Sequence, residues 1–237
     1  YPGTHYIGHD GAASPWPIHP QNGRDLSYYD RNDFGPYKSY HVVGRHTDFF
    51  GAWWHDEDAG MARYSTRDDK PGKKIWIWGL SPQGMIWERL LTDTSGQYVE
   101  VQSGRLFNQS NEASTRSPFK HRGFAPGATD TWTEYWFPVK GLGGFVKASD
   151  VGALNVRRDA GRMSVAFMAV RRVSGVLQVL DAERLVVERS VVLAPMDAVD
   201  LVSPEDVPDH RLRVVLRAHG GSALFEYVLE YLEVNGI

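Results

Sequence analysis

The chain of 237 residues is 42% hydrophobic and 23% charged, as expected for a folded globular protein of one large domain or a domain with a small appendage. Its formal net charge of −3 at pH 7 argues against binding nucleic acid mainly through phosphate contacts, so we expect no nucleic-acid partner. The absence of cysteine excludes disulfides, zinc–thiolate sites, iron–sulfur clusters and cysteine nucleophiles.

Tryptophan and histidine are unevenly distributed along the chain. All eight tryptophans lie between Trp16 and Trp136, and seven of the nine histidines lie between His5 and His121. The remainder is rich in valine, leucine and arginine and contains no tryptophan. We therefore expect the first part of the chain to carry a polar-aromatic site and the second part to act as scaffold.

No signal peptide is visible at the start of the sequence, and no membrane-spanning segment is expected within it. The chain begins at Tyr1 without an initiator methionine and without the basic and apolar segments of a signal peptide, so we expect it to be a piece of a longer protein. The apolar segment 191–196 is interrupted by Pro195, and no uninterrupted apolar run approaches the roughly 20 residues of a membrane helix. We expect no membrane partner, and the composition fits any compartment.

Residues 1–36 are rich in turn-forming residues and aromatic anchors, which predicts an ordered irregular arm packed on the main domain. Beyond the arm, short runs of β-type residues between turn signals predict strands. The predicted strands cover residues 37–46, 49–55, 73–79, 85–91, 97–102, 131–139, 143–149, 152–158, 163–171, 175–181, 185–193, 210–218 and 223–234. Polar and turn-forming residues predict a long loop over 108–129.

Alternation of apolar and polar residues dominates over helical periodicity. In the segment 211–218, Leu212, Val214 and Leu216 fall on one face, which indicates a strand with one buried side. Asp159-Ala-Gly161 is a hairpin signal. Together these features predict an all-β fold, a large antiparallel β-sandwich with little helix, formed mainly by residues 37–194. Residues 195–237 either complete the sandwich or begin a small appendage.

Two glutamates alternate with aromatic or amide residues at strand spacing. The alternating sets are Tyr98, Glu100 and Gln102, and Trp132, Glu134 and Trp136. An aromatic ring covers the apolar C–H face of a sugar while a carboxylate accepts its hydroxyl hydrogens, so these sets predict a carbohydrate site. The alternative is structural, because a strand tryptophan commonly packs in a core and a glutamate commonly lies at the rim.

A second cluster surrounds two adjacent tryptophans, Trp53 and Trp54, with His46 and His55 on either side. Neutral histidine is a good general acid or base near pH 7, although a single histidine is more often a structural, hydrogen-bonded residue. A metal site would need further ligands such as Asp48 and Asp56. No recognised zinc or calcium spacing is present, so we expect no metal.

A third cluster supplies hydrogen-bond donors that could bind hydroxyls or an acidic sugar. Its members are Gln102, Arg105, Gln109, His121 and Arg122. The alternative is a turn at Ser103-Gly104 with Arg105 paired to a surface acid. Phosphate-binding glycine loops and the serine-hydrolase elbow are both absent from the sequence, so we expect no cofactor.

Long motifs in the first two-thirds of the chain resemble a known family. They cover residues 72–88, 90–93, 96–109 and 131–139. They resemble a bacterial domain of unknown function that is found upstream of tetratricopeptide repeats in large multidomain proteins. That domain is in turn similar to the galactose mutarotase-like supersandwich of aldose epimerases and of domains in glycoside hydrolases and polysaccharide lyases. The resemblance implies this fold for residues 10–160. Epimerases of the fold use a carboxylate base and histidine acids, but their paired-histidine motif is not recognisable in this chain.

We therefore expect a carbohydrate-binding or accessory β-sandwich module of a larger protein, with a helical-repeat region of the same chain as a partner. The expected ligand-binding residues are Trp53, Trp54, Tyr98, Gln102, Arg105, Gln109, His121, Arg122, Trp132 and Trp136. The alternative is a sugar-acting enzyme, epimerase-like or glycoside-cleaving, with Glu100 and Glu134 as acid and base and His46 or His55 assisting. A third hypothesis is a protein-interaction scaffold with exposed aromatic patches.

Overall fold

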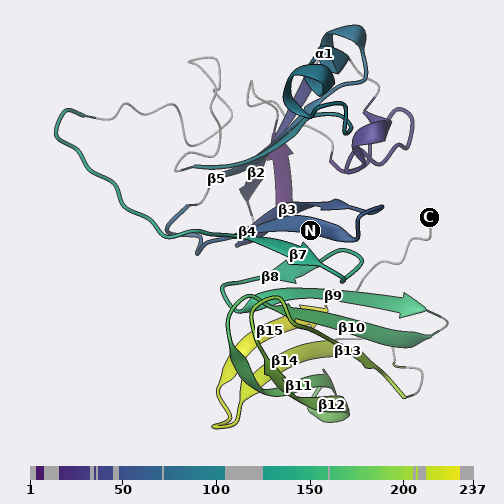
Figure 1. Cartoon of the computed structure of the whole chain (residues 1–237), viewed down its shortest axis with the longest axis vertical. Coiled ribbons are helices and arrows are strands. Elements are labelled where there is room, and N and C mark those ends of the chain that lie inside the picture. Colours follow the sequence, from purple (N-terminus) through teal and green to yellow (C-terminus); the bar gives the residue numbers. More distant parts are fainter. Residues whose placement is uncertain are drawn as a thin grey trace. The chain divides into compact units, whose positions relative to one another are not determined.

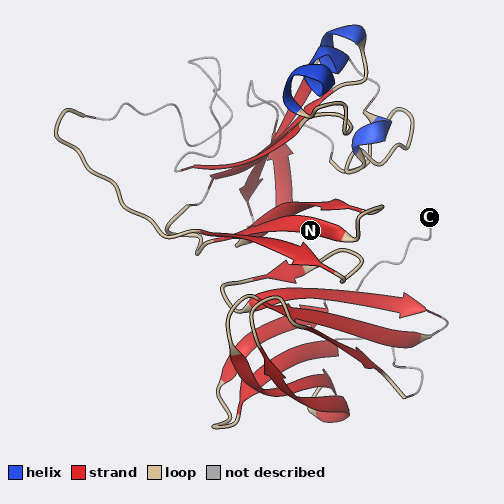
Figure 2. Ribbon diagram, in the orientation of Figure 1, coloured by secondary structure: helices blue, strands red, loops and turns tan. Residues whose placement is uncertain are grey.

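A computed structural model describes residues 4–7, 16–32, 35, 37–44, 48–70, 72–104, 125–159, 161–204, 207 and 212–229. The chain divides into two compact units, the first formed by Tyr1–Thr47 and Thr66–Glu134 and the second by Asp48–Ser65 and Tyr135–Ile237. Both are built mainly from antiparallel strands, as Figure 2 shows. The predicted all-β antiparallel class with little helix is confirmed.

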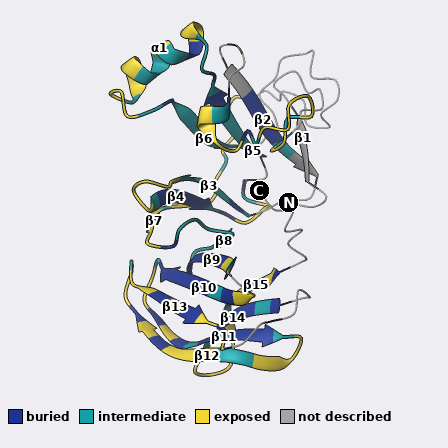
Figure 3. Cartoon of the chain, turned by 90° about the vertical axis from the view of Figure 1, so that its right-hand side faces the viewer, coloured by how far each residue is buried: buried dark blue, intermediate teal, exposed yellow. Residues whose placement is uncertain are grey.

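The first unit contains one four-stranded antiparallel sheet in the order β1-β2-β5-β6. Figure 1 labels β2 and β5, and Figure 3 labels all four strands. Its elements are β1 (Thr4–Ile7), the short 3-10 helix η1 (Tyr29–Arg31), β2 (Tyr37–Gly44), β5 (Gly72–Trp78), the helix α1 (Pro82–Leu91) and β6 (Val99–Gly104). β1 lies within the segment predicted to be irregular, so that prediction is wrong for these four residues.

One face of this sheet carries a small apolar core. Leu26, Tyr40 and Ile77 are buried together, and the ring of Trp16 lies 4.4 Å from that of Tyr40. The aromatic anchors expected in the arm are therefore present at Trp16. Asn32 helps to order the arm, because its side-chain amide donates to the carbonyls of Leu26 and Tyr28.

The helix α1 corrects the prediction of a strand over residues 85–91. Ser81 caps the helix, since its hydroxyl accepts a hydrogen bond from the backbone N–H of Gly84, and Pro82 occupies the first turn. Trp87 packs from the helix against Trp78 of β5, with ring centroids 4.7 Å apart. Capping and this tertiary contact outweigh the β preference of the apolar run.

The second unit contains three antiparallel sheets. They are β3-β4-β7, β13-β10-β9-β8 and β12-β11-β14-β15. Their strands are β3 (Phe49–Trp54), β4 (Ala59–Tyr64), β7 (Tyr135–Lys140), β8 (Lys147–Ala148), β9 (Gly152–Asp159), β10 (Arg162–Ala169), β11 (Val173–Asp181), β12 (Arg184–Leu193), β13 (Ala198–Val202), β14 (Leu212–Ala218) and β15 (Ala223–Leu229). The strands β4 and β13 were not predicted. The strand predicted over 143–149 is only the two residues of β8.

The sheet containing β9 and β10 is buried on both faces, which Figure 3 shows as a largely dark-blue layer. Along β10, Val165 and Phe167 point into one core, while Ala166 and Met168 point into another. The first core lies between this sheet and the β12-β11-β14-β15 sheet, and the second lies against the β3-β4-β7 sheet. Strands buried on both sides explain why apolar residues here run almost without alternation.

The predicted alternation in β14 is confirmed, because Leu212, Val214 and Leu216 all join the core cluster. The hairpin predicted at Asp159-Ala-Gly161 is also confirmed, since Asp159 of β9 pairs with Arg162 of β10. Among the described strands that follow residue 194, β13 pairs with β10 and β14 pairs with β11, while β15 pairs with β14.

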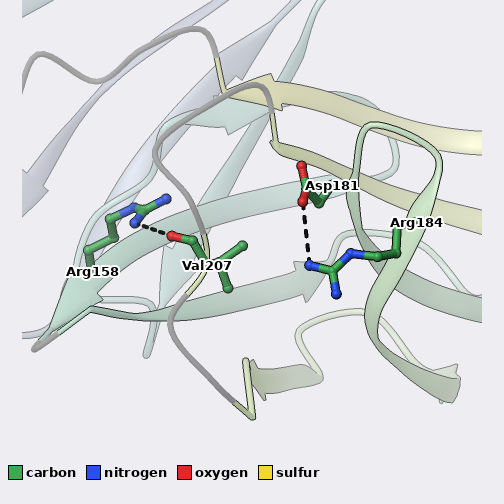
Figure 4. Close-up of polar contacts among 4 residues, drawn as sticks. All are labelled: Arg158, Asp181, Arg184 and Val207. Carbon is green, nitrogen blue, oxygen red and sulfur yellow. Dashed lines mark hydrogen bonds and ion pairs between the residues drawn. The ribbon is translucent and has the colours of Figure 1, made fainter.

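Two arginines of the second unit make contacts of different kinds, both drawn in Figure 4. Arg158 donates from its Nη1 to the carbonyl oxygen of Val207 at 2.9 Å, which ties β9 to a loop residue. Arg184 lies 3.4 Å from Asp181 across the turn between β11 and β12. In the described part of the chain, no helix is both long and apolar enough to cross a membrane.

Candidate functional site

The expected site residues divide between the two units. Tyr98, Glu100, Gln102, Trp132 and Glu134 belong to the first unit, and Trp53, Trp54, His55 and Trp136 belong to the second. The remaining expected residues, His46, Arg105, Gln109, His121 and Arg122, lie outside the described residues.

One face of the β1-β2-β5-β6 sheet carries a set of residues that we call the tryptophan face. Its members are Lys74, Trp76 and Trp78 on β5, and Glu100 and Gln102 on β6. In the antiparallel register Trp76 pairs with Glu100 and Lys74 pairs with Gln102, so the side chains project to the same side. The rings of Trp76 and Trp78 have centroids 6.3 Å apart and an interplanar angle of 37°.

Polar contacts fix the carboxylate of the tryptophan face. The side-chain amide of Gln102 donates a hydrogen bond to Glu100. Burial lowers the pKa of the Lys74 ammonium, and the nearby Glu100 carboxylate opposes that shift. Burial raises the pKa of Tyr98, and Glu100 raises it further. The face therefore combines half-buried aromatic surface with a charge pair of opposite sign.

A second arrangement of the first unit, which we call the Trp132 platform, consists of Lys70, Ser103, Trp132 and Glu134. Lys70 is only 7% exposed, and its Nζ lies 3.4 Å from the centroid of the Trp132 ring. The indole N–H of Trp132 points to Glu134 Oε1 at 3.4 Å, and the Ser103 hydroxyl donates to Glu134 Oε2 at 2.8 Å. Trp132 remains 45% exposed. Lys70 thus lies over one face of the ring, while close to half of the surface of Trp132 meets solvent.

The expected pairing of Trp132, Glu134 and Trp136 on one strand face is wrong. β7 begins at Tyr135, so Trp132 and Glu134 precede the strand and only Trp136 belongs to it. The carboxylate of Glu134 nevertheless lies beside Trp132, because the indole N–H and Ser103 both contact it. Aromatic ring and carboxylate do meet, through a loop rather than through strand alternation.

Glu100 and Glu134 are held at opposite faces of the sheet. Glu100 pairs with Trp76, whereas Ser103, which binds Glu134, pairs with Lys73. Positions three apart on a strand point to opposite sides. This register gives no support to an acid–base pair of Glu100 and Glu134 in one cleft, the arrangement that a two-carboxylate glycosidase requires.

The adjacent tryptophans of the second unit have different environments, since successive strand residues alternate in direction. Trp53 packs against the apolar core, with its ring 6.3 Å from that of Phe145. Trp54 is 51% exposed. Trp136 of β7 is also exposed and packs edge-on against Phe50 of β3, with ring centroids 6.0 Å apart. Trp53 is therefore a core residue, whereas Trp54 and Trp136 are each exposed.

His55 and Asp56 occupy the exposed turn between β3 and β4. No cluster of three or more metal-ligating side chains of histidine, aspartate or glutamate occurs within the described residues. His46, which the sequence grouped with His55, lies outside those residues.

Four residues of these two arrangements were not among the expected site residues: Lys70, Lys74, Trp76 and Trp78. The i, i+2 spacing of the two tryptophans on a predicted strand is a signal that could have found them. Lys70 carries no such signal, because its contact with Trp132 joins residues far apart in the chain. Ser103 was interpreted only as part of a turn.

A domain of unknown function, DUF5107, matches residues 1–139, which is more than half of the chain. The chain belongs to this family. The matched region contains the tryptophan face, the Trp132 platform and the β3-β4-β7 sheet up to Val139, whereas the strands from β8 onward lie beyond it. No solved structure matches the chain significantly.

Proposed function

We propose that this chain is a carbohydrate-binding or accessory β-sandwich module of a larger protein. The observation that carries the proposal is the Trp132 platform, in which an exposed indole ring is fixed in place beside a carboxylate. Sugars are recognised by such a combination, because the ring covers apolar C–H groups and the carboxylate accepts hydroxyl hydrogens.

Preorganisation supports binding rather than a purely structural role for Trp132. Lys70 beneath the ring and Ser103 at Glu134 restrict both groups before any ligand arrives. A ligand that meets ordered groups loses less conformational entropy on binding. A tryptophan that served only packing would bury its ring, whereas Trp132 leaves 45% of its surface exposed.

The resemblance of residues 10–160 to a domain found upstream of tetratricopeptide repeats supports a place in a multidomain protein with such repeats. The same resemblance supports a galactose mutarotase-like ancestry for the family region. An enzymatic role as a two-carboxylate hydrolase has less support, since Glu100 and Glu134 project from opposite faces of the sheet.

The test is binding of the full chain to soluble neutral polysaccharides, measured by affinity electrophoresis and by titration calorimetry with oligosaccharides. We expect binding that falls about tenfold or more in Trp132→Ala, as for an aromatic hot spot. Tyr29→Ala, which removes an aromatic side chain of the first unit that is 46% exposed and is not among the expected site residues, serves as the control and is expected to leave binding unchanged. Absence of binding to every sugar, or binding that survives Trp132→Ala, would contradict the proposal.

A further inference from the structure

We infer that the Trp132 platform selects uncharged pyranoses, and that Lys70 is the residue that discriminates against cationic amino sugars. The inference deepens the proposed function and rests on it, since it names the class of sugar that the same platform takes. It follows from where the two charges of the platform lie relative to the exposed ring.

Lys70 already occupies the position that a cationic ligand would use. An aromatic ring attracts a cation through the negative charge of its π face. The Lys70 ammonium, 3.4 Å from the ring centroid, takes up this attraction from one side and is itself buried. A second cation would gain little from a ring whose π charge already attracts Lys70, and it would be repelled by the Lys70 ammonium.

Glu134 disfavours the opposite class of ligand. Its carboxylate lies at the edge of the Trp132 ring and is fixed by Ser103 at 2.8 Å. A uronic acid stacked on the ring would bring a second carboxylate close to Glu134, and like charges in a partly desolvated site repel. A neutral sugar avoids both repulsions and still donates hydroxyl hydrogens to Glu134.

The tryptophan face shows the same compensation of charge beside aromatic rings. Lys74 and Glu100 lie on one face of the sheet next to Trp76, with Glu100 held by Gln102. Neither of the two described aromatic–polar arrangements therefore pairs its rings with charges of only one sign. A surface adapted to acidic or basic polysaccharides would instead be expected to carry a field of one sign.

The experiment compares three ligands of matched length at mildly acidic pH: a neutral gluco-oligosaccharide, a polygalacturonate oligomer and a fully deacetylated chitosan oligomer. Calorimetric titration of the unmodified chain is expected to rank the neutral oligomer first. In Lys70→Met, which keeps an apolar side chain of similar length beneath the ring, we expect chitosan affinity to rise about three- to tenfold. In Glu134→Gln, polygalacturonate affinity is expected to rise by a similar factor.

Lys140→Met, at an exposed position of β7, is the matched control for loss of one positive charge and is expected to leave the ranking unchanged. Retained binding of the neutral oligomer shows that each variant is folded. If no oligomer binds the unmodified chain, the proposed function itself fails. If neutral sugar binds but chitosan or polygalacturonate binds equally well, or Lys70→Met leaves the affinity for chitosan unchanged, the selectivity inference is overturned and the proposed function stands.

Discussion

The two units differ in what they bury. In the second unit, one cluster of described residues buries twenty hydrophobic side chains between two sheets. In the first unit, the described apolar core has three buried members, Leu26, Tyr40 and Ile77. Among the described residues, the first unit buries six polar side chains, Asn32, Ser39, His41, Lys70, Lys73 and Gln97, and the larger second unit buries four, Arg63, Ser65, Asn155 and Ser203. Burial of polar groups costs free energy unless they are hydrogen-bonded, so the two units obtain their stability differently.

This contrast indicates where function lies. A sandwich of valine, leucine and phenylalanine is a stable support that carries little chemistry, whereas departures from ideal core packing concentrate at functional sites. The family match ends at residue 139, so it includes the polar-aromatic first unit and leaves out β8 to β15. All eight tryptophans lie in the matched region. Tryptophan fluorescence therefore reports on that region, and far-ultraviolet circular dichroism on the whole chain.

The strongest test of the contrast is removal of a large side chain from the sandwich core. Phe167 of β10 is fully buried and packs edge-on against Phe225 of β15, with ring centroids 5.3 Å apart. Phe167→Ala leaves a cavity and is expected to lower the free energy of unfolding by about 3–5 kcal/mol. Urea unfolding followed by circular dichroism measures the change.

Phe167→Leu, which keeps most of the apolar volume, is the matched control, and its free energy of unfolding is expected to fall much less. A loss below about 1 kcal/mol for Phe167→Ala would mean that the second unit does not depend on this core. The second unit would then not owe its stability mainly to its apolar core.

In the small core of the first unit, a single hydroxyl is expected to make stability fall at alkaline pH. Tyr40 is 1% exposed, and its hydroxyl has no hydrogen-bond partner among the described residues. Burial raises the pKa of Tyr40 well above its usual value. Above about pH 10 the unfolded chain loses this proton and the folded chain retains it, so stability falls by up to about 1.4 kcal/mol per pH unit.

Tyr40→Phe removes the titrating group, and we expect its stability to decline less steeply above pH 10. At neutral pH the variant is expected to be more stable by about 1 kcal/mol, because a buried hydroxyl without a partner is removed. Denaturant unfolding across pH, monitored by tryptophan fluorescence, measures both effects. Tyr28→Phe, at an exposed position, is the control. Equal pH profiles for Tyr40→Phe and the unmodified chain would show that this core does not control alkaline stability.

Capping of α1 is expected to have a smaller effect. Ser81 accepts a hydrogen bond from the Gly84 N–H and donates one to the Gly35 carbonyl at 2.9 Å. Ser81→Ala is expected to destabilise the first unit by about 1 kcal/mol. Ser81→Asp restores the capping acceptor and should recover part of the loss. The fluorescence of Trp87 on the helix and of Trp78, which packs against it, provides a local signal. No difference between Ser81→Ala and the unmodified chain would argue that packing alone holds the helix.

Most strands of the second unit were predicted from the sequence, whereas the helix α1 was not. Strands of the second unit were predictable because β-branched residues and a two-residue turn signal agree with the register seen at Asp159 and Arg162. The run 85–91 is equally apolar, but Ser81 and Pro82 just before it form a helix-start signal that the strand interpretation passed over. Local turn chemistry decided the element, and apolar content alone did not.

The candidate site was less predictable than the fold. Glu134 and Trp132 were expected to meet, and they do, but through a loop rather than a strand face. Lys70 and Ser103 join them only because β5 and β6 pair and because the loop before β7 returns to the same sheet. Such long-range contacts depend on tertiary pairing, which periodicity within one segment does not encode.

The smallest expected effect comes from the surface of the second unit. Arg184 lies 3.4 Å from Asp181 across a hairpin turn, and its side chain is 59% exposed. Solvent screens such a pair, and holding both side chains costs conformational entropy, so Arg184→Ala is expected to change the free energy of unfolding by less than about 0.5 kcal/mol. Thermal unfolding at low and high salt measures it, with Arg184→Lys as the charge-preserving control. A salt-dependent loss above about 1 kcal/mol would mean that surface charge, and not only the apolar cluster, stabilises this unit.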